Sequence, residues 1–72
     1  MTNNYKPISC HLYDKLEELA IKKQKVKIIY FDNELTLETE DIIVDFKTKN
    51  KEEFAILSSG LIIRLDKIVK II

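Results

Sequence analysis

The stretch KVKIIYFDNELTLETEDIIVDF, residues 25–46, decides the fold of this chain. Its first part places apolar or aromatic side chains at every second residue, at Val26, Ile28 and Tyr30. Successive side chains of a strand point to opposite faces of a sheet, so this period of two predicts a strand with one buried face. The next two residues, Asp32 and Asn33, tolerate positive φ and predict a two-residue hairpin turn.

The second part, ELTLETEDIIVDF, predicts one long strand that contains a phase slip. Its early apolar residues are odd-numbered and its later ones even-numbered: Leu35, Leu37, Ile42, Val44 and Phe46. A period of two cannot keep both sets on one face unless a bulge or break separates them. We expect that break at residues 39–41, where the bend would curl a small sheet toward a barrel.

Upstream of this stretch the apolar spacing is helical. Ser9 is a suitable N-cap because its hydroxyl can accept a hydrogen bond from an unpaired backbone N–H. The apolar residues that follow recur at helical spacing and give one apolar face: Leu12, Leu16, Leu19 and Ala20. The helix is expected to end near Gln24, and residues 1–6 before it are expected to be flexible.

Downstream, the sequence predicts a polar loop at residues 47–51 and a strand at residues 53–58. Ser59 and Gly60 predict a turn into LIIRL, residues 61–65, and a short last strand follows Asp66. The chain therefore reads as a single domain, residues 1–72, with a mainly β fold. One N-terminal helix precedes a small five-stranded antiparallel barrel and packs over one end or face of it.

Composition favours a binding module over an enzyme. A chain of 72 residues can hardly spare core for a large enclosed active site. Its 12 basic and 12 acidic residues balance, which argues against a general nucleic-acid binder. One cysteine, no apolar run near 20 residues and no signal-peptide pattern predict a cytoplasmic protein without a membrane span.

No catalytic or metal-binding pattern is present in the sequence. Cys10 and His11 are the only residues of their types, so a second ligand pair for zinc is missing. Cys10 at a helix start could be a nucleophile, but the interpretation that we favour is a small buried hydrophobe. We expect no enzyme activity, no metal and no cofactor.

Acidic residues carry more information. No Lys or Arg occurs from Ile28 to Phe46, while six acids do: Asp32, Glu34, Glu38, Glu40, Asp41 and Asp45. They either form a negative surface for a basic partner or are solvated charges that discourage aggregation. Tyr5 and Tyr13 have two corresponding interpretations, as interface anchors or as rings packed on the fold.

Residues 5–17, YKPISCHLYDKLE, resemble the opening of the Rho-binding antiterminator family, also called Rof or YaeO. The family pattern is roughly Tyr-x-Pro-Ile-x-Cys, two residues, then Tyr-Asp-x-Leu-Glu. It is met by Tyr5, Pro7, Ile8, Cys10, Tyr13, Asp14, Leu16 and Glu17. RLDKI, residues 64–68, resembles the closing motif of the family, so the resemblance spans nearly the whole chain.

The resemblance implies an Sm-like barrel preceded by a helix. Such proteins bind the hexameric termination factor Rho at its primary RNA-binding sites and inhibit Rho-dependent termination, without catalysis or a cofactor. The acids of the helix would stand where RNA phosphates bind, Tyr13 where a base stacks, and the 47–51 loop would make a second contact. The candidate partner-binding residues are Tyr5, Tyr13, Asp14, Glu17, Glu18, Lys49 and Asn50.

His11 and Leu12 depart from the family pattern, since many relatives carry acids at these positions. The helix also reads one residue longer before Leu19. Loss of two acids would weaken binding to Rho or retune it to a different Rho. The apolar stripe of the helix gains Leu12 in return.

Two other functions stay open. The first is an Sm-like RNA-binding module, for which the basic cluster consists of Lys22, Lys23, Lys25 and Lys27. The second is an oligomer-forming adaptor without an activity of its own. For the inhibitor we expect a monomer when free and no direct contact with nucleic acid.

Overall fold

The computed structural model describes residues 5–72 of the chain. In chain order the elements are α1 (Cys10–Lys22), β1 (Lys25–Asp32), β2 (Leu35–Lys49), β3 (Glu52–Leu57), β4 (Ile62–Arg64), the 3₁₀ turn η1 (Leu65–Lys67) and β5 (Ile68–Ile71). The predicted class, mainly β with one N-terminal helix and five antiparallel strands, is confirmed. The flexibility expected for residues 1–6 falls largely on residues 1–4, which lie outside the described residues.

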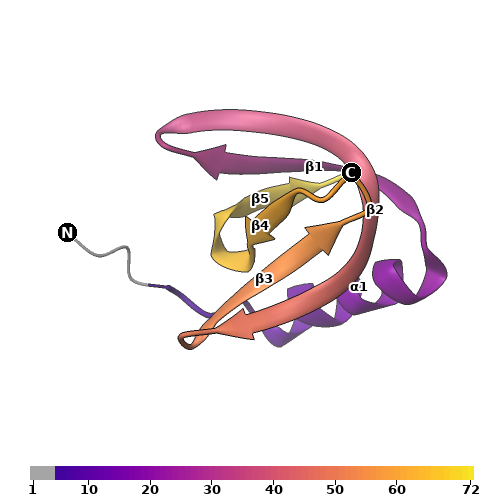
Figure 1. The fold of residues 1–72 in the computed structure, drawn as a ribbon, viewed down its shortest axis with the longest axis horizontal. Coiled ribbons are helices and arrows are strands. Elements are labelled where there is room, and N and C mark those ends of the chain that lie inside the picture. Colours follow the sequence, from indigo (N-terminus) through magenta and orange to yellow (C-terminus); the bar gives the residue numbers. More distant parts are fainter. Residues whose placement is uncertain (1–4) are drawn as a thin grey trace.

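The five strands form one curved antiparallel sheet in the order β4-β3-β2-β1-β5. Figure 1 shows the long β2 curving round from the first hairpin to β3, so that the two halves of the sheet face each other. The edge strands β4 and β5 are joined by η1. This curvature encloses the core that a flat sheet of the same strands would leave open on one face.

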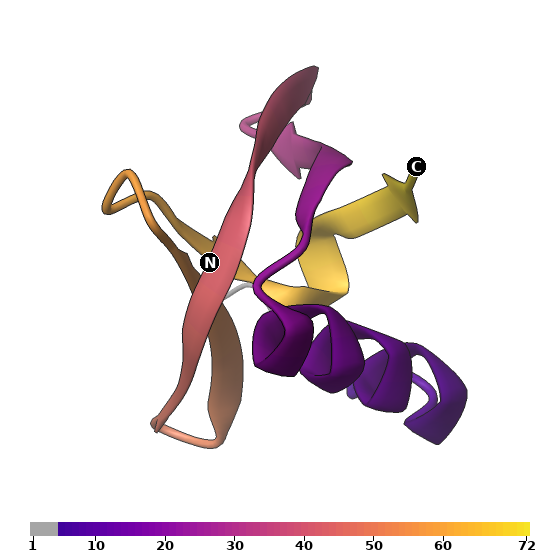
Figure 2. The same ribbon diagram turned by 90° about the vertical axis from the view of Figure 1, so that its right-hand side faces the viewer.

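The helix α1 starts where the sequence predicted, with Ser9 as its N-cap. The backbone N–H of Leu12 donates to Ser9 Oγ at 3.2 Å, which makes Ser9 the N-cap. The helix ends at Lys22, two residues before the predicted end, because Lys23 adopts φ 52 and closes the last turn. Leu16 and Leu19 are the buried residues of this helix. The helix packs on β2 (Figure 2).

The first hairpin turns one residue later than predicted. Asn33 and Glu34 have φ values of 48° and 68°, and Asp32 pairs with Leu35. A two-residue turn with positive φ at both positions matches the right-handed twist of the strands. Asp32 therefore stays in β1, and the predicted turn at residues 32–33 is wrong by one position.

The phase slip of β2 lies at Val44, later than the predicted residues 39–41. Ile43 pairs with Leu57 and Asp45 with Ile56, so Val44 is the extra residue of a bulge. Inward-facing residues stay odd-numbered through Ile43, and Val44 is turned outward with 53% of its surface exposed. The prediction that Val44 shares the inner face is therefore wrong.

A buried carboxylate explains why the slip comes so late. Asp41 is only 8% exposed. Because charged side chains are rarely buried, an aspartate at an inward position looks like the end of the apolar alternation. Its carboxylate accepts hydrogen bonds from the Ser58 hydroxyl, the Ser59 N–H and the Ile42 N–H. With these partners the charge is tolerated inside, and β2 keeps its phase past Asp41.

The predicted polar loop at residues 47–51 is also shorter in the structure. β2 continues to Lys49, and only Asn50 and Lys51 form the turn, with φ values of 52° and 63°. Thr48 and Lys49 pair with residues of β3. Exposed strand ends carry polar side chains on both faces, so the sequence did not separate them from a loop.

The core lies between the curved sheet and α1. It consists of Leu16, Leu19, Val26, Ile28, Ile43, Ala55, Leu57, Ile63 and Leu65. Each strand except β5 contributes to it, and η1 adds Leu65. The inner side of α1 is thereby fixed to the sheet, and its outer side faces solvent.

Candidate partner-binding surface

Three acids lie on the exposed part of α1. Asp14, Glu17 and Glu18 are three and four residues apart and are all exposed. Glu18 pairs with Lys22 at 2.7 Å, and this hydrogen bond, with the lysine charge, lowers the pKa of Glu18. Asp14 and Glu17 have no ion pair within residues 5–72. Two of the three predicted acids are therefore available to a partner.

Tyr13 packs its ring on the sheet next to these acids. Its ring centroid lies 5.5 Å from that of Phe46 in a stacked arrangement, and the side chain is half-buried. Burial, followed by the charges of Glu53 and Glu17, raises the pKa of Tyr13. The hydroxyl is protonated at neutral pH, as in any tyrosine of ordinary or raised pKa, and can donate a hydrogen bond to a partner.

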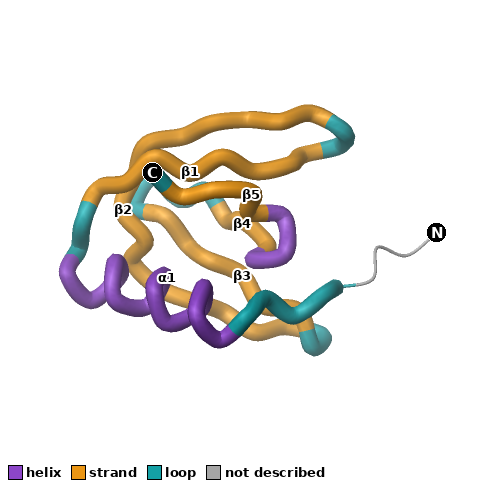
Figure 3. Tube along the Cα trace, turned by 180° about the vertical axis from the view of Figure 1, so that it is seen from behind, coloured by secondary structure: helices purple, strands orange, loops and turns teal. Residues whose placement is uncertain are grey.

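Tyr5, before the start of α1, is held by contacts with β3 and β4. Its hydroxyl donates to Glu53 Oε1 at 2.9 Å, and Arg64 lies over its ring with Cζ 5.7 Å from the centroid. Burial, then this hydrogen bond and the neighbouring carboxylates, raise the pKa of Tyr5. The backbone N–H of Lys6 donates to Asp66 at 3.2 Å. These contacts attach Tyr5 to β3 and Lys6 to η1, and Figure 3 shows the path of the chain that leads from them into α1.

Arg64 organises this attachment. Its Nε and Nη2 donate to the two carboxylate oxygens of Asp66 at 2.6 and 2.9 Å, and Nη1 lies 3.6 Å from Glu52. Only 12% of its side chain is exposed, and the Asp66 hydrogen bond raises the pKa of Arg64. Sequence reasoning missed Glu53 and Arg64 as supports of Tyr5. The sequence signals for Arg64 were its charge within the apolar segment LIIRL and its place in the RLDKI segment.

Lys49 and Asn50 lie at the end of the β2–β3 hairpin. Both are exposed, and Asn50 takes the first position of the turn with φ 52. Thr48 pairs with Glu53, the acceptor of the Tyr5 hydrogen bond. The hairpin end and the fastened N-terminal segment therefore share one end of the molecule. We call Tyr5, Tyr13, Asp14, Glu17, Lys49 and Asn50 together the arm–helix surface.

The acids of residues 28–46 do not act as one group. Asp41 is a buried structural residue, and Glu38 pairs with Lys27 at 3.3 Å. Asp32 and Glu34 lie at the end of the first hairpin. Asp45 is exposed on β2 beside α1. Glu40 is exposed and lies opposite Lys27 in the register of β1 and β2. The fold thus divides the six acids among several environments.

Two other candidate features give no site. Cys10 is exposed as the first residue of α1, so the favoured interpretation of a buried hydrophobe is wrong. His11, next to it, is exposed as well. Residues 5–72 contain no group of three or more His, Cys, Asp or Glu side chains suited to hold a metal ion. Within the same residues no helix has the length and apolar character needed to cross a membrane.

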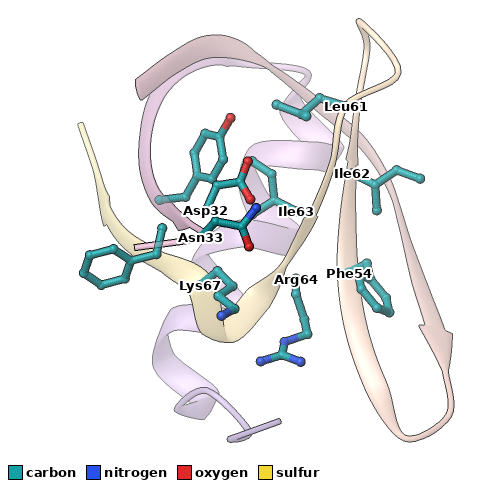
Figure 4. A pocket seen from close by; sticks show the side chains of 10 residues that line it. Asp32, Asn33, Phe54, Leu61, Ile62, Ile63, Arg64 and Lys67 are labelled. Carbon is teal, nitrogen blue, oxygen red and sulfur yellow. The ribbon is translucent and has the colours of Figure 1, made fainter. Parts of the chain in front are cut away.

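A hollow opens between the first hairpin and β4 (Figure 4). It has a volume of about 330 Å³ and is lined by Tyr30, Phe31, Asp32, Asn33, Phe54, Leu61, Ile62, Ile63, Arg64 and Lys67. Phe31 and Ile62 are about half exposed there. Three aromatic rings and a lysine thus meet at a place that sequence spacing did not suggest.

Comparisons with protein-family models, curated proteins and solved structures found no match for this chain.

Proposed function

We propose that this protein belongs to the Rho-binding antiterminator family and inhibits Rho-dependent transcription termination in the cytoplasm. It would bind Rho as a monomer and occlude the primary RNA-binding site. The observation that carries the proposal is the YKPISCHLYDKLE segment, whose Asp14 and Glu17 have no ion pair within residues 5–72. The proposed role is binding, without catalysis or a cofactor.

Charge and shape support this mode of inhibition. Sites that bind RNA are basic because they neutralise phosphates. Carboxylates carry the same sign of charge as phosphates, so carboxylates held on a helix can occupy such a basic site in place of RNA. Asp14 and Glu17 are three residues apart, so they project from neighbouring turns of one face. Tyr13 presents an aromatic side chain beside them, and aromatic faces replace bases readily in stacking pockets.

Attachment of the N-terminal segment supports the same interface. Ordering a free segment at an interface opposes binding through lost conformational entropy. Tyr5 is already held by Glu53 and Arg64, so this loss is reduced before the partner arrives. Lys49 and Asn50, at the exposed end of the β2–β3 hairpin, would add a second polar contact.

The test measures binding to purified Rho with a short pyrimidine RNA as competitor. The wild-type protein is expected to displace RNA, and Asp14→Lys combined with Glu17→Lys is expected to abolish displacement. Glu34→Lys combined with Glu40→Lys is the matched control, since it makes the same charge change at exposed acids away from α1. If both double variants lost displacement of RNA equally, the loss would follow from the change in net charge and not from the position of the acids on α1. Retained displacement in the α1 variant would overturn the assignment.

The hollow of Figure 4 favours RNA binding as a second candidate function. Tyr30, Phe31 and Phe54 could stack bases there, with Lys67 near a phosphate. The basic cluster of residues 22–27 lies apart from it: along β1, Lys25 is about 17 Å and Lys27 about 10 Å from Tyr30, and Lys27 pairs with Glu38 at 3.3 Å. Direct RNA binding that weakens with salt and in Phe31→Ala would favour this function over inhibition of Rho.

A further inference from the structure

An open groove lies between the outer side of α1 and β2, beside the arm–helix surface. It has a volume of about 230 Å³ and is lined by Glu17, Ala20, Ile21, Val44, Asp45 and Phe46. Ile21 is 81% exposed and Val44 53% exposed. Two large aliphatic side chains therefore face solvent in the same groove.

The groove results from two separate features of the chain. Ile21 follows Glu17 by four residues and so lies one helical turn along the same face. Val44 is turned outward because it is the extra residue of the β2 bulge. Single exposed apolar residues are common and need no explanation, whereas contiguous apolar surface rimmed by polar groups is typical of interaction sites when the patch is large. Here the fold brings together two exposed apolar residues that are distant in sequence.

The rim of the groove is acidic. Glu17 and Asp45 are the only charged residues that line it, and neither forms an ion pair within residues 5–72. One oxygen of Asp45, Oδ1, accepts from the backbone N–H of Phe46 at 2.8 Å, which orients the carboxylate. An apolar floor with an acidic rim complements a long basic side chain, whose aliphatic stem packs while its head stays charged.

We propose that this groove receives an arginine or lysine side chain of the protein partner. Its stem would cover Ile21 and Val44, and its cationic head would meet Glu17 and Asp45. The inference rests on the proposed function, because the partner is Rho, and it extends the interface one helical turn beyond Asp14. The volume lies below the ~300–1,000 Å³ of sites for drug-sized ligands, as expected for a single side chain.

The closing experiment measures the affinity of Rho for wild type, Ile21→Ser and Leu35→Ser at low and high salt. Leu35 is the matched control, because it is 62% exposed and does not line the groove. Ile21→Ser is expected to weaken binding about tenfold at both salt concentrations, since apolar contact is not screened. Glu17→Gln is expected to weaken binding mainly at low salt, because salt screens exposed charges. Leu35→Ser should bind as wild type.

The outcomes separate this inference from the proposed function. If wild type binds Rho and Ile21→Ser binds equally well, the groove assignment is overturned and the inhibitor function stands. If wild type does not bind Rho, both are overturned. Circular dichroism checks that each variant is folded, and Val44→Thr repeats the test from β2 should Ile21→Ser fail to fold. Equal weakening in Leu35→Ser would also overturn the assignment, because it would show a general effect of exposed apolar residues.

Discussion

The inner and outer sides of α1 belong to one helix, but the residues of the inner side are buried in the core and those of the outer side face solvent. On the inner side Leu16 is fully buried and Leu19 is 8% exposed. On the outer side Ile21 is 81% exposed, and Asp14 and Glu17 have no ion pair within the described part of the chain. Changes on the inner side should therefore act on stability, and changes on the outer side on binding.

Carboxylates of the chain show the same contrast. Asp41 is 8% exposed, and the Ser58 hydroxyl, Ser59 and the Ile42 N–H all donate to it. Asp14 and Glu17 are exposed. An acid that contributes to the fold is thus distinguished from one available to a partner by its hydrogen bonds and not by its place in the sequence.

The largest expected effect is on the inner side of α1. Leu16→Ala should lower the free energy of unfolding by about 2–5 kcal/mol, because it removes buried methyl groups and leaves a cavity. Ile21→Ala on the outer side is the control and should change it by less than about 0.5 kcal/mol. Urea denaturation followed by circular dichroism measures both. Similar losses in the two variants would contradict the division of the helix into two sides.

The next effect concerns the pH dependence of stability. Hydrogen bonds, first from the Ser58 side chain, hold the pKa of Asp41 well below its ordinary value. Because the folded pKa is depressed, the stability from Asp41 is present above the unfolded pKa. That pKa is about 3.9, and the contribution is lost as pH falls through the folded pKa. Wild type should therefore lose stability on acidification below about pH 4 more steeply than Asp41→Asn.

Thermal melts at several pH values measure this difference. The control is Asp14→Asn, which makes the same change at an exposed acid that has no ion pair within residues 5–72. A wild-type slope in Asp41→Asn would mean that the hydrogen bonds of Asp41 do not favour its ionised form. Asp41→Asn should also be less stable than wild type at neutral pH, because an amide cannot accept three hydrogen bonds as a carboxylate does.

The smallest effect is expected at the start of α1, where both sides begin. Ser9→Ala removes the N-cap and should lower the free energy of unfolding by about 1 kcal/mol. Ser9→Asp should restore it, since aspartate is an equally good cap. If Ser9→Ala also weakened binding to Rho, the outer residues of α1 would depend on an ordered first helical turn for their binding. Chemical denaturation and the binding assay together separate the two results.

Part of this structure could be predicted from local patterns. The N-cap at Ser9, the buried face of α1 and the alternation of Val26 and Ile28 each depend on residues a few positions apart. The turn of the first hairpin was missed by one residue, because Asp32 and Asn33 are both good turn formers. The bulge of β2 was predicted, but at residues 39–41 and not at Val44, because a buried aspartate with partners looks, in the sequence, like an exposed one.

The residues of the candidate site could be named from the sequence, but the contacts that support them could not. The acids of α1 could be named from spacing and resemblance. The hydrogen bond from Tyr5 to Glu53 joins residues 48 positions apart, and no local period contains that information. The groove of Ile21 and Val44 likewise depends on how α1 packs on β2.

The sequence by itself determined the class of the fold, because periods of 3.6 and 2 are local consequences of backbone geometry. It also determined where α1 starts and which side of it is apolar. The tertiary structure alone decided which acids are buried, which are paired and which face solvent. Burial and hydrogen bonding depend on residues that meet only after the sheet curves. For the same reason, only the folded chain brings Tyr5 to Glu53 and Ile21 beside Val44.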